Sequence, residues 1–200
     1  CSGSVQEVMD LGAVAHLATL KSRVPFLHFF DGFRTSHEVQ KIEIWDYEDL
    51  RDMLDMQDVA DFRARALNPE HPVLRGSAEN SDIFFQHREA CNKYYNDAVA
   101  ATVMYMDKVN EKIGTNYKPF NYYGAPDADR IIIAMGSVCD TIKETVDFLN
   151  ARGEKTGMVC VHLYRPFSAE YLISAIPETV KTISCLLYTS PSPRDPKTSR

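Results

Sequence analysis

Residues 130–137 read Arg-Ile-Ile-Ile-Ala-Met-Gly-Ser, and this stretch decides the fold of the chain. A short run of β-branched residues closed by glycine is typical of a strand buried on both faces of a sheet. Residues 158–164 and 180–187 have the same character. Helical spacings fill the intervals between the three runs, at 141–151 and 169–176. Because strands that alternate with helices favour a parallel sheet, we expect a three-layer α/β domain here.

Two further segments precede this predicted sheet. Gln86–Ile113 keeps small and aromatic residues on one helical face and is followed by Gly114, which predicts a long helix. Ser4 with Glu7 three residues later resembles a capping box, and an apolar series after them predicts another helix. Arg23–Phe30 is a short apolar run and predicts a strand. One helix and one strand cannot form a domain, so they are expected to end a larger α/β unit that is incomplete here.

The segment 42–80 is expected to be a helical linker. Its first part has apolar residues at helical intervals and predicts two short helices. Two prolines so close together, at 69 and 72, force extended backbone in this part of the segment. At the other end of the chain, residues 188–200 contain three prolines, three serines and no apolar periodicity. We expect this tail to be disordered or non-native and exclude it from functional reasoning.

Composition excludes several classes of protein. The 200 residues are 44% hydrophobic and 25% charged, with a net charge of -6, which is typical of globular domains and argues against a nucleic-acid partner. The longest apolar stretch, Leu11–Leu20, is half of the about twenty residues that a membrane span needs. The five cysteines are scattered without a CxxC pair. They predict reduced thiols, a cytoplasmic protein and no metal ligands.

The most polar segment directly follows the predicted strand 23–30. In parallel sheets, ligands gather at the carboxyl ends of strands, so this loop is a candidate cofactor-binding segment. Its candidate residues are Asp31, Arg34, Thr35, Ser36, His37 and Glu38. The alternative is structural: Arg34 pairs with Asp31 or Glu38 to lock a turn, while Thr35 or Ser36 caps the next helix. The sequence does not separate the two interpretations, because both require the same residue types.

Two weaker candidates follow the later strands. Gly136 and Ser137 place free N–H groups at the start of a helix, which suits an anion such as a phosphate or carboxylate. A tight turn with a helix cap explains the same pair, since the GxGxxG spacing is missing. Arg165 follows the strand 158–164 and is a candidate for anion binding or for an interface.

No catalytic residue can be assigned from the sequence. There is no GxSxG motif and no cysteine with a placed histidine. His16 and His28 lie in apolar segments and are expected to be buried core histidines. Residues 121–126 are expected to form a turn whose aromatic side chains cover the sheet edge.

Several separate segments resemble the pyruvate:ferredoxin (flavodoxin) oxidoreductase family. They are Gly12–Leu20, Arg23–Glu38, Asn68–Pro72, Arg75-Gly76, Tyr123–Pro126, Met135–Ser137 and Leu163–Phe167. The resemblance runs from about Ser4 to Ser184, and near Cys185 the chain departs from the family pattern.

The resemblance implies a large homodimeric enzyme that uses thiamine diphosphate, magnesium and 4Fe-4S clusters. Such an enzyme decarboxylates pyruvate, reduces ferredoxin or flavodoxin and passes the acetyl group to coenzyme A. It also implies that 1–41 ends the pyrimidine-binding thiamine domain and that 81–187 is a transketolase C-terminal-like domain. The cofactor-activating glutamate, the diphosphate site and the cluster cysteines of the family lie outside these segments. The fragment alone is therefore expected to be inactive, and the alternative is a non-catalytic α/β interaction module or a separate subunit.

Overall fold

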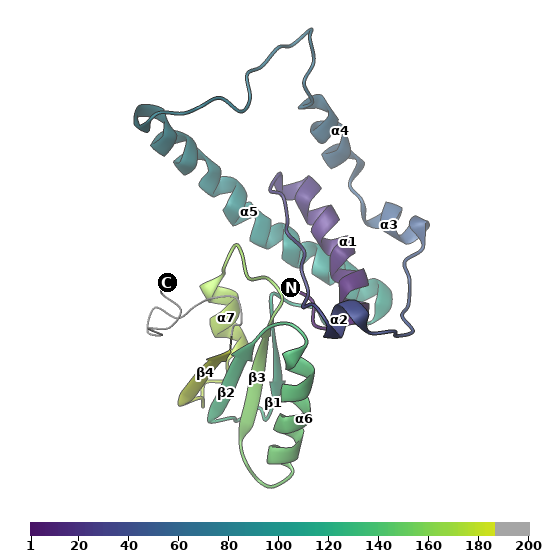
Figure 1. Cartoon of the computed structure of the whole chain (residues 1–200), viewed down its shortest axis with the longest axis vertical. Helices are drawn as coiled ribbons and strands as arrows, with labels where there is room; N and C mark the ends of the chain where they lie inside the picture. Colours follow the sequence, from purple (N-terminus) through teal and green to yellow (C-terminus); the bar gives the residue numbers. More distant parts are fainter. Residues whose placement is uncertain (187–200) are drawn as a thin grey trace. The chain divides into compact units, whose positions relative to one another are not determined.

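The structure is a computed structural model that describes residues 1–186 (Figure 1). The chain forms two compact units, which we describe separately. The first contains Cys1–Leu11, His28–Glu43 and the described residues from Tyr117 on, and the second contains Gly12–Leu27 and Ile44–Asn116. The predicted tail at 188–200 lies outside the described residues.

The first unit is built on a four-stranded sheet in the order β1-β3-β2-β4. Its strands are β1 (Phe120–Gly124), β2 (Arg130–Ala134), β3 (Thr156–Val161) and β4 (Thr182–Leu186). Strands β3 and β4 both pair with β2 in parallel, as the alternation of strands and helices predicts. Each of the three predicted strands is present, within a few residues of its expected bounds.

Strand β1 corrects the sequence analysis. The prediction of a turn at 121–126 is wrong, because Phe120–Gly124 pairs antiparallel with β3 along its whole length. The register joins Gly124 to Gly157 and Phe120 to Val161. An antiparallel edge strand needs burial on only one face, so it can carry the polar and aromatic residues that concealed it.

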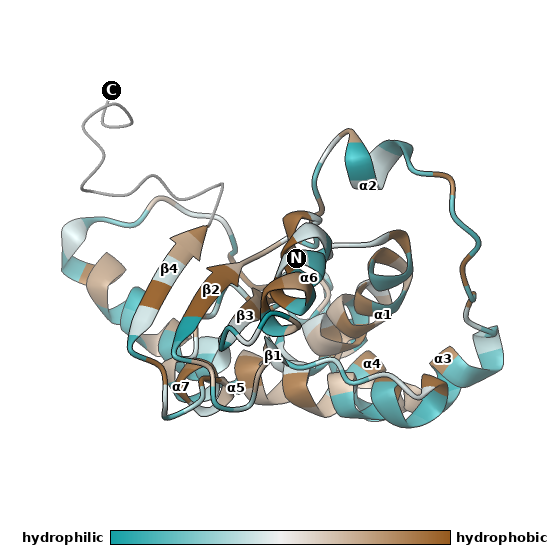
Figure 2. Cartoon of the chain, turned by 90° about the horizontal axis from the view of Figure 1, so that it is seen from below, coloured by the Kyte–Doolittle hydropathy of each residue, from teal (hydrophilic) through white to brown (hydrophobic). Residues whose placement is uncertain are grey.

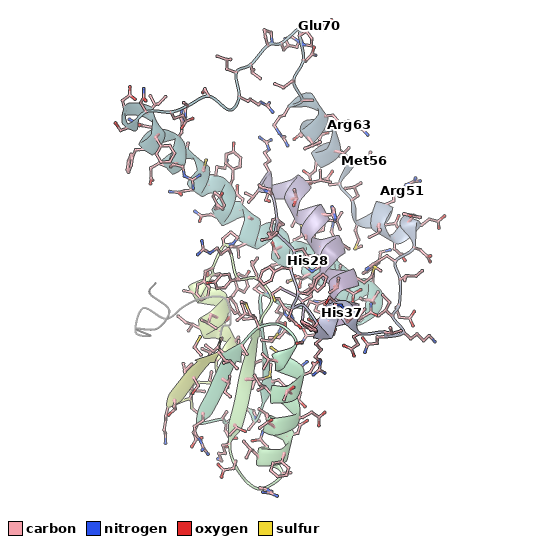
Figure 3. All side chains as sticks on the ribbon, in the orientation of Figure 1. His28, His37, Arg51, Met56, Arg63 and Glu70 are labelled. Carbon is pink, nitrogen blue, oxygen red and sulfur yellow. The ribbon has the colours of Figure 1, made fainter. Side chains whose placement is uncertain are left out.

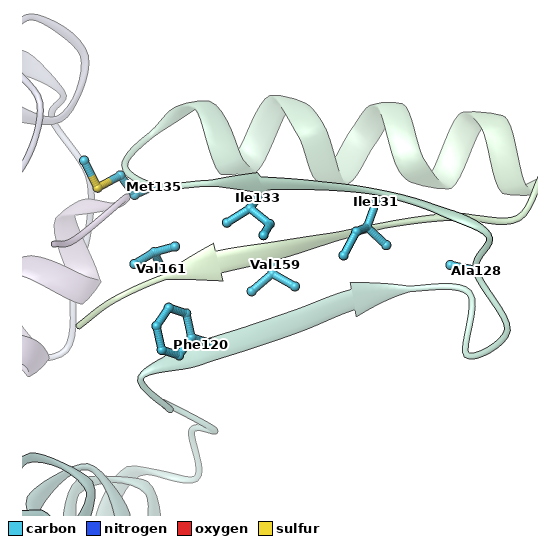
Figure 4. Close-up of a cluster of buried hydrophobic side chains, with 7 residues drawn as sticks. All are labelled: Phe120, Ala128, Ile131, Ile133, Met135, Val159 and Val161. Carbon is cyan, nitrogen blue, oxygen red and sulfur yellow. The ribbon is translucent and has the colours of Figure 1, made fainter. Parts of the chain in front are cut away.

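Alternate side chains of the sheet enter two separate cores. Figure 4 shows the first core, which α7 (Ala169–Ala175) supplements with partly buried side chains. Its members are Phe120, Ala128, Ile131, Ile133, Met135, Val159 and Val161. The second core joins Met158, Cys160 and Ala134 of the sheet to Cys139, Ile142 and Val146 of α6 (Val138–Asn150). The two helices therefore cover opposite faces, which confirms the expected three-layer α/β arrangement, and Figure 2 shows most of β2 as hydrophobic.

The predicted N-terminal helix is present as α1 (Val5–Ser22). The backbone N–H of Glu7 donates to Oγ of Ser4 over 3.2 Å, which is one half of a capping box, whereas the Glu7 carboxylate accepts from the Gly3 N–H over 2.6 Å. The predicted strand at Arg23–Phe30 is wrong, since an isolated bridge between Ser2 and Phe30 is the only β pairing of this segment within residues 1–186. Pro25 lacks an N–H donor and Arg23 has a φ of 62°, so neither residue suits a ladder.

The second unit is helical. Its elements, besides the later turns of α1, are α3 (Tyr47–Met53), α4 (Met56–Ala64) and α5 (Ser81–Ile113). The two short helices expected within 42–80 are thus confirmed, and the long helix begins at Ser81 rather than at Gln86. Surface ion pairs link these helices: Lys21 Nζ lies 3.3 Å from Asp55, and Lys112 Nζ lies 2.7 Å from Asp49.

The 33-residue helix α5 is buried only in its second half. The buried side chains are Ala98, Ala101, Thr102, Tyr105, Met106 and Val109, and residues 81–90 are all exposed. Gly114 ends the helix with a φ of 70°, a left-handed conformation that favours glycine. None of the helices within residues 1–186 has the length and apolar character that crossing a membrane requires.

We predict that Gly124→Ala disrupts the β1–β3 pairing. Gly124 has a φ of 128°, and an added Cβ would lie 2.6 Å from the Gly157 Cα and 2.6 Å from the Thr156 carbonyl oxygen, both of them backbone atoms. Backbone atoms cannot move aside as easily as the end of a flexible side chain. The loss of stability should therefore reach about 3 kcal/mol or more. Hydrogen exchange of the β1 and β3 amides in the intact protein measures it.

Gly153→Ala is the matched control for this substitution. Gly153 also has a positive φ, 88°, but an added Cβ there meets open space. Its cost should be limited to the backbone conformation, about 1 kcal/mol. Equal amide protection in the two variants would contradict the proposed clash.

Candidate functional site

Two of the predicted site segments meet in one pocket of about 380 Å³. Asp31 and Arg34 come from the polar loop, and Gly136 and Ser137 come from the turn between β2 and α6. The remaining lining residues are Cys1, Phe29, Phe30, Met135, Val138 and Thr141. The pocket lies where β2 ends, which is the position that the sequence analysis expects for a ligand site in a parallel sheet.

Asp31 holds the loop against the start of α6. The backbone N–H of Ser137 donates to Asp31 Oδ1 over 2.9 Å, and Thr35 Oγ1 donates to the same oxygen over 3.1 Å. A carboxylate is favoured at this position because the first N–H groups of a helix lack partners within the helix. Gly136, with a φ of 81°, provides the turn that brings Ser137 to the carboxylate.

The ionised form of Asp31 is stabilised at this site. Burial of the carboxyl group opposes ionisation, but the hydrogen bonds from Ser137 and Thr35 outweigh it and hold the pKa of Asp31 below its ordinary value. The anion expected at Gly136 and Ser137 is thus supplied by the chain itself. The alternative pairing of Arg34 with Asp31 or Glu38 is absent from the described residues.

The other loop residues lie on the short helix α2 (Arg34–His37) and just after it. Thr35 is buried, whereas Arg34, Ser36, His37 and Glu38 are exposed. Ser36 Oγ lies 2.7 Å from His37 Nδ1, and Figure 3 shows His37 on α2.

Arg165 and the two N-terminal histidines do not join the pocket. Arg165 is exposed and its guanidinium lies 5.7 Å from the centre of the Tyr164 ring. The prediction of a buried His16 is wrong, because this residue faces solvent on α1. His28 is half-buried, and its Nε2 lies 2.7 Å from Ser2 Oγ.

Sequence reasoning missed a buried ion pair in the first unit. His162, which follows β3, is 7% exposed, and its Nε2 lies 3.6 Å from Glu7 Oε1. Its Nδ1 lies 3.0 Å from the Lys118 carbonyl oxygen and 3.0 Å from Asn121 Oδ1. Because these neighbours accept hydrogen bonds and the Glu7 carboxylate carries a negative charge, the surroundings favour the doubly protonated ring.

The pKa values of the pair move apart. Burial works to raise the pKa of Glu7, but the hydrogen bond and charge of His162 and the N–H of Gly3 hold it below its ordinary 4.5. Burial works to lower the pKa of His162, but the Cys160 sulfur and the Glu7 carboxylate raise it from 6.5 to about 10. Since Glu7 stands in a capping box and His162 in a strand pattern, the sequence carries no signal that joins them.

We predict that Asp31→Ala loosens the start of α6. Loss of this carboxylate leaves the Ser137 N–H without its acceptor, which should cost about 1 kcal/mol, as for other N-terminal helix caps. The Ser137 amide of the intact protein should then exchange about fivefold faster. Because the pKa of Asp31 is lowered by folding, the difference from wild type should vanish as pH falls through it. Unchanged exchange at neutral pH would contradict the capping role.

We predict a pH-dependent loss of stability in Glu7→Gln. Removing one partner of a buried ion pair costs about 3 kcal/mol, whereas Asp49→Asn, at the exposed pair with Lys112, should cost less than about 1 kcal/mol. The contribution of the Glu7 carboxylate to stability is present above its unfolded pKa of 4.5. It is lost as pH falls through the lowered pKa of the folded state. The contribution of the protonated His162 ring to stability is complete below its unfolded pKa of 6.5. It is lost as pH rises through the folded pKa of about 10.

The loss of stability in Glu7→Gln should therefore be largest between pH 4.5 and pH 6.5, which are the ordinary pKa values of Glu7 and His162. Differential scanning calorimetry of the intact protein across this range measures it. A difference from wild type that does not change with pH would rule out an ionic contribution.

Comparison with known proteins gives two family matches in order along the chain. Residues 1–107 match the family model "Pyruvate flavodoxin/ferredoxin oxidoreductase, thiamine diP-bdg". Residues 128–186 match the model "Pyruvate:ferredoxin oxidoreductase core domain II". The first match alone covers more than half of the chain.

Individual relatives agree with the family models. The chain is 61% identical over 183 residues to the pyruvate-flavodoxin oxidoreductase of Enterobacter agglomerans, covering 92% of this chain and 16% of that protein. It is 56% identical over 185 residues to the pyruvate:ferredoxin oxidoreductase of Moorella thermoacetica, with the same two coverages. A chain of the solved 2-oxoglutarate:ferredoxin oxidoreductase from Magnetococcus marinus aligns at 23% identity over 54% of this chain and 17% of that one, and its TM-score of 0.34 is too low to establish a common fold.

These matches confirm the resemblance drawn from the sequence. The matched segment is 16% of the length of these two curated relatives. The chain belongs to the pyruvate:ferredoxin/flavodoxin oxidoreductase family, and it includes part of the thiamine diphosphate-binding portion together with core domain II.

Proposed function

We propose that the full-length protein containing this chain is a thiamine diphosphate-dependent pyruvate oxidoreductase. The observation that carries the proposal is the 61% identity to a pyruvate-flavodoxin oxidoreductase over 92% of the chain. Pyruvate and coenzyme A are its substrates, and ferredoxin or flavodoxin accepts the electrons. The described fold is the scaffold of two portions of this enzyme.

The proposed reaction balances as an oxidative decarboxylation. Pyruvate and coenzyme A give acetyl-coenzyme A, carbon dioxide, one proton and two electrons. The bond between the carboxylate and carbonyl carbons of pyruvate breaks, and a thioester bond to the coenzyme A sulfur forms. Thiamine diphosphate with magnesium supplies the chemistry at the carbonyl carbon, and 4Fe-4S clusters carry the electrons.

Within residues 1–186, the polar loop and the start of α6 do not fit a thiamine diphosphate site by themselves. Across residues 1–186, no group of three or more His, Cys, Asp and Glu side chains gathers where it could hold a metal ion. The Ser137 N–H at the start of α6 already binds the Asp31 carboxylate, which would repel a diphosphate. The loop Asp31–Glu38 is therefore proposed to be a neighbour of the cofactor site, whose ligands come from the rest of the enzyme.

The domain assignment and cellular setting extend the proposal. Residues 1–41 would end the pyrimidine-binding thiamine domain, 42–80 would be a linker, and 81–187 would form the transketolase C-terminal-like domain. The core domain II match supports the last of these over residues 128–186, whereas the thiamine-binding match continues to residue 107 and so extends past the proposed boundary at 81. We further propose a cytoplasmic homodimer, in which Arg165 serves an anion site or an interface.

We predict that the full-length protein reduces a low-potential one-electron acceptor when both pyruvate and coenzyme A are present. Resequencing of the source DNA through both ends of this segment gives the open reading frame for expression. Omission of either substrate should lower the rate at least about tenfold, and the 200-residue chain alone should be inactive. A cluster-loaded full-length protein without acceptor reduction would overturn the proposal.

A further inference from the structure

Part of the thiamine-binding match belongs to the same compact unit as core domain II. Residues 1–107 match the thiamine-binding model, but Cys1–Leu11 and His28–Glu43 lie in the first unit together with the matched residues 128–186. The polar loop Asp31–Glu38 is in the second of these segments. Contacts within the first unit therefore set the position of this loop.

Two carboxylates one turn apart on α1 form a buried cluster with a histidine and a tyrosine. Glu7 Oε1 lies 3.6 Å from Nε2 of His162, and Asp10 Oδ2 accepts a 2.8 Å hydrogen bond from the Tyr117 hydroxyl. The Tyr117 and His162 rings meet edge to face with 6.0 Å between their centres, so the two pairs are in contact. Asp10 is only 1% exposed, and Gln6 Nε2 donates to its other oxygen over 3.1 Å.

A buried cluster of this kind fixes the orientation of a helix. Removing charges from water is costly, so a buried ion pair adds little stability compared with apolar packing. Each carboxylate is satisfied only when the face of α1 that carries Glu7 and Asp10 lies against its partners. A turn of α1 by one residue would rotate this face by about 100° and leave two buried carboxylates without donors.

The orientation of α1 is passed on to the polar loop. Ser2, just before α1, donates its backbone N–H to the Phe29 carbonyl oxygen over 3.0 Å. Gly3 lies against the turn between β2 and α6, where an added Cβ would be 2.8 Å from the Gly136 carbonyl oxygen. The Asp31 carboxylate binds the start of α6 at the same turn. The start of the loop is thus held both by the residues before α1 and by the end of β2.

We infer that the buried cluster positions the polar loop Asp31–Glu38 on core domain II, with Glu7 and Asp10 as positioning residues. The cluster orients α1, the residues before α1 hold the segment at Phe29, and the loop follows this segment directly. The inference rests on the proposed function, in which the loop is a neighbour of the cofactor site. Core domain II thereby contributes to the geometry of a site whose ligands lie elsewhere in the enzyme.

The first experiment measures amide exchange in the full-length protein. Asp10→Asn keeps the size of the side chain and removes its charge. The Ser137 amide should then exchange at least about threefold faster than in wild type, although its own hydrogen bond goes to Asp31. Asp147→Asn is the matched control, because Asp147 accepts a 2.8 Å hydrogen bond from the Tyr123 hydroxyl in the same unit but both side chains are exposed. Ser137 exchange that is equal in Asp10→Asn and wild type would overturn the inference.

A second variant removes the same hydrogen bond from its other side. Tyr117→Phe deletes only the hydroxyl group and should also speed exchange of the Ser137 amide. In the double variant with Asp10→Asn, the increase should be smaller than the product of the two single increases, since both substitutions remove one shared interaction. Increases that multiply would show that the two residues act independently and would contradict the cluster.

Steady-state kinetics separate positioning from a general loss of folded enzyme. Asp10→Asn should raise the KM for pyruvate at least about fivefold and leave the KM for coenzyme A within about twofold, because the loop is proposed to neighbour the site of the carbonyl chemistry. A smaller amount of folded enzyme lowers kcat and changes neither KM. Asp147→Asn should have the KM values of wild type.

The same measurements distinguish a failure of this inference from a failure of the proposed function. An active Asp10→Asn enzyme with both KM values unchanged retains the proposed function and overturns the positioning role. A wild-type protein that reduces no acceptor overturns the proposed function, whereas exchange of the Ser137 amide still decides whether the cluster holds the loop.

Discussion

The first unit depends on the parallel ladder between β2 and β3. The two strands pair over the full length of β2, from Arg130 to Ala134, and every other residue points to the same face. This alternation divides the buried side chains into two cores and requires an apolar cover for each. The helices α6 and α7 provide those covers, so the three-layer arrangement follows from the apolar character of two short strands.

The ladder also positions the candidate site. The end of β2 fixes the Gly136 turn and therefore the first N–H groups of α6. Asp31 reaches one of those groups from a loop more than a hundred residues earlier in the chain. Charge-assisted hydrogen bonding between Ser137 and Asp31 thus joins the two predicted site segments.

The sequence was sufficient for elements whose signal is local. The Ile131–Ile133 run and the Ser4 cap identify a strand and a helix from their own residues, and both are present. It was insufficient where pairing with a distant strand decides whether a segment is a strand. The polar and aromatic segment β1 is a strand because it pairs with β3 at the edge of the sheet. The apolar segment 23–30 is not a strand, and among the described residues it has a single isolated bridge. The Glu7–His162 pair joins residues far apart in the chain, so no local pattern could reveal it.

The uneven burial of α5 has a mechanical consequence. An α-helix rises 1.5 Å per residue, so the exposed half from Ser81 to Asp97 is an arm about 25 Å long. The half that begins at Ala98 is clamped by its buried side chains and sets the direction of this arm. A rotation of about 5° at the clamp would displace the tip by roughly 2 Å, so the position of the tip depends on the packing around Tyr105.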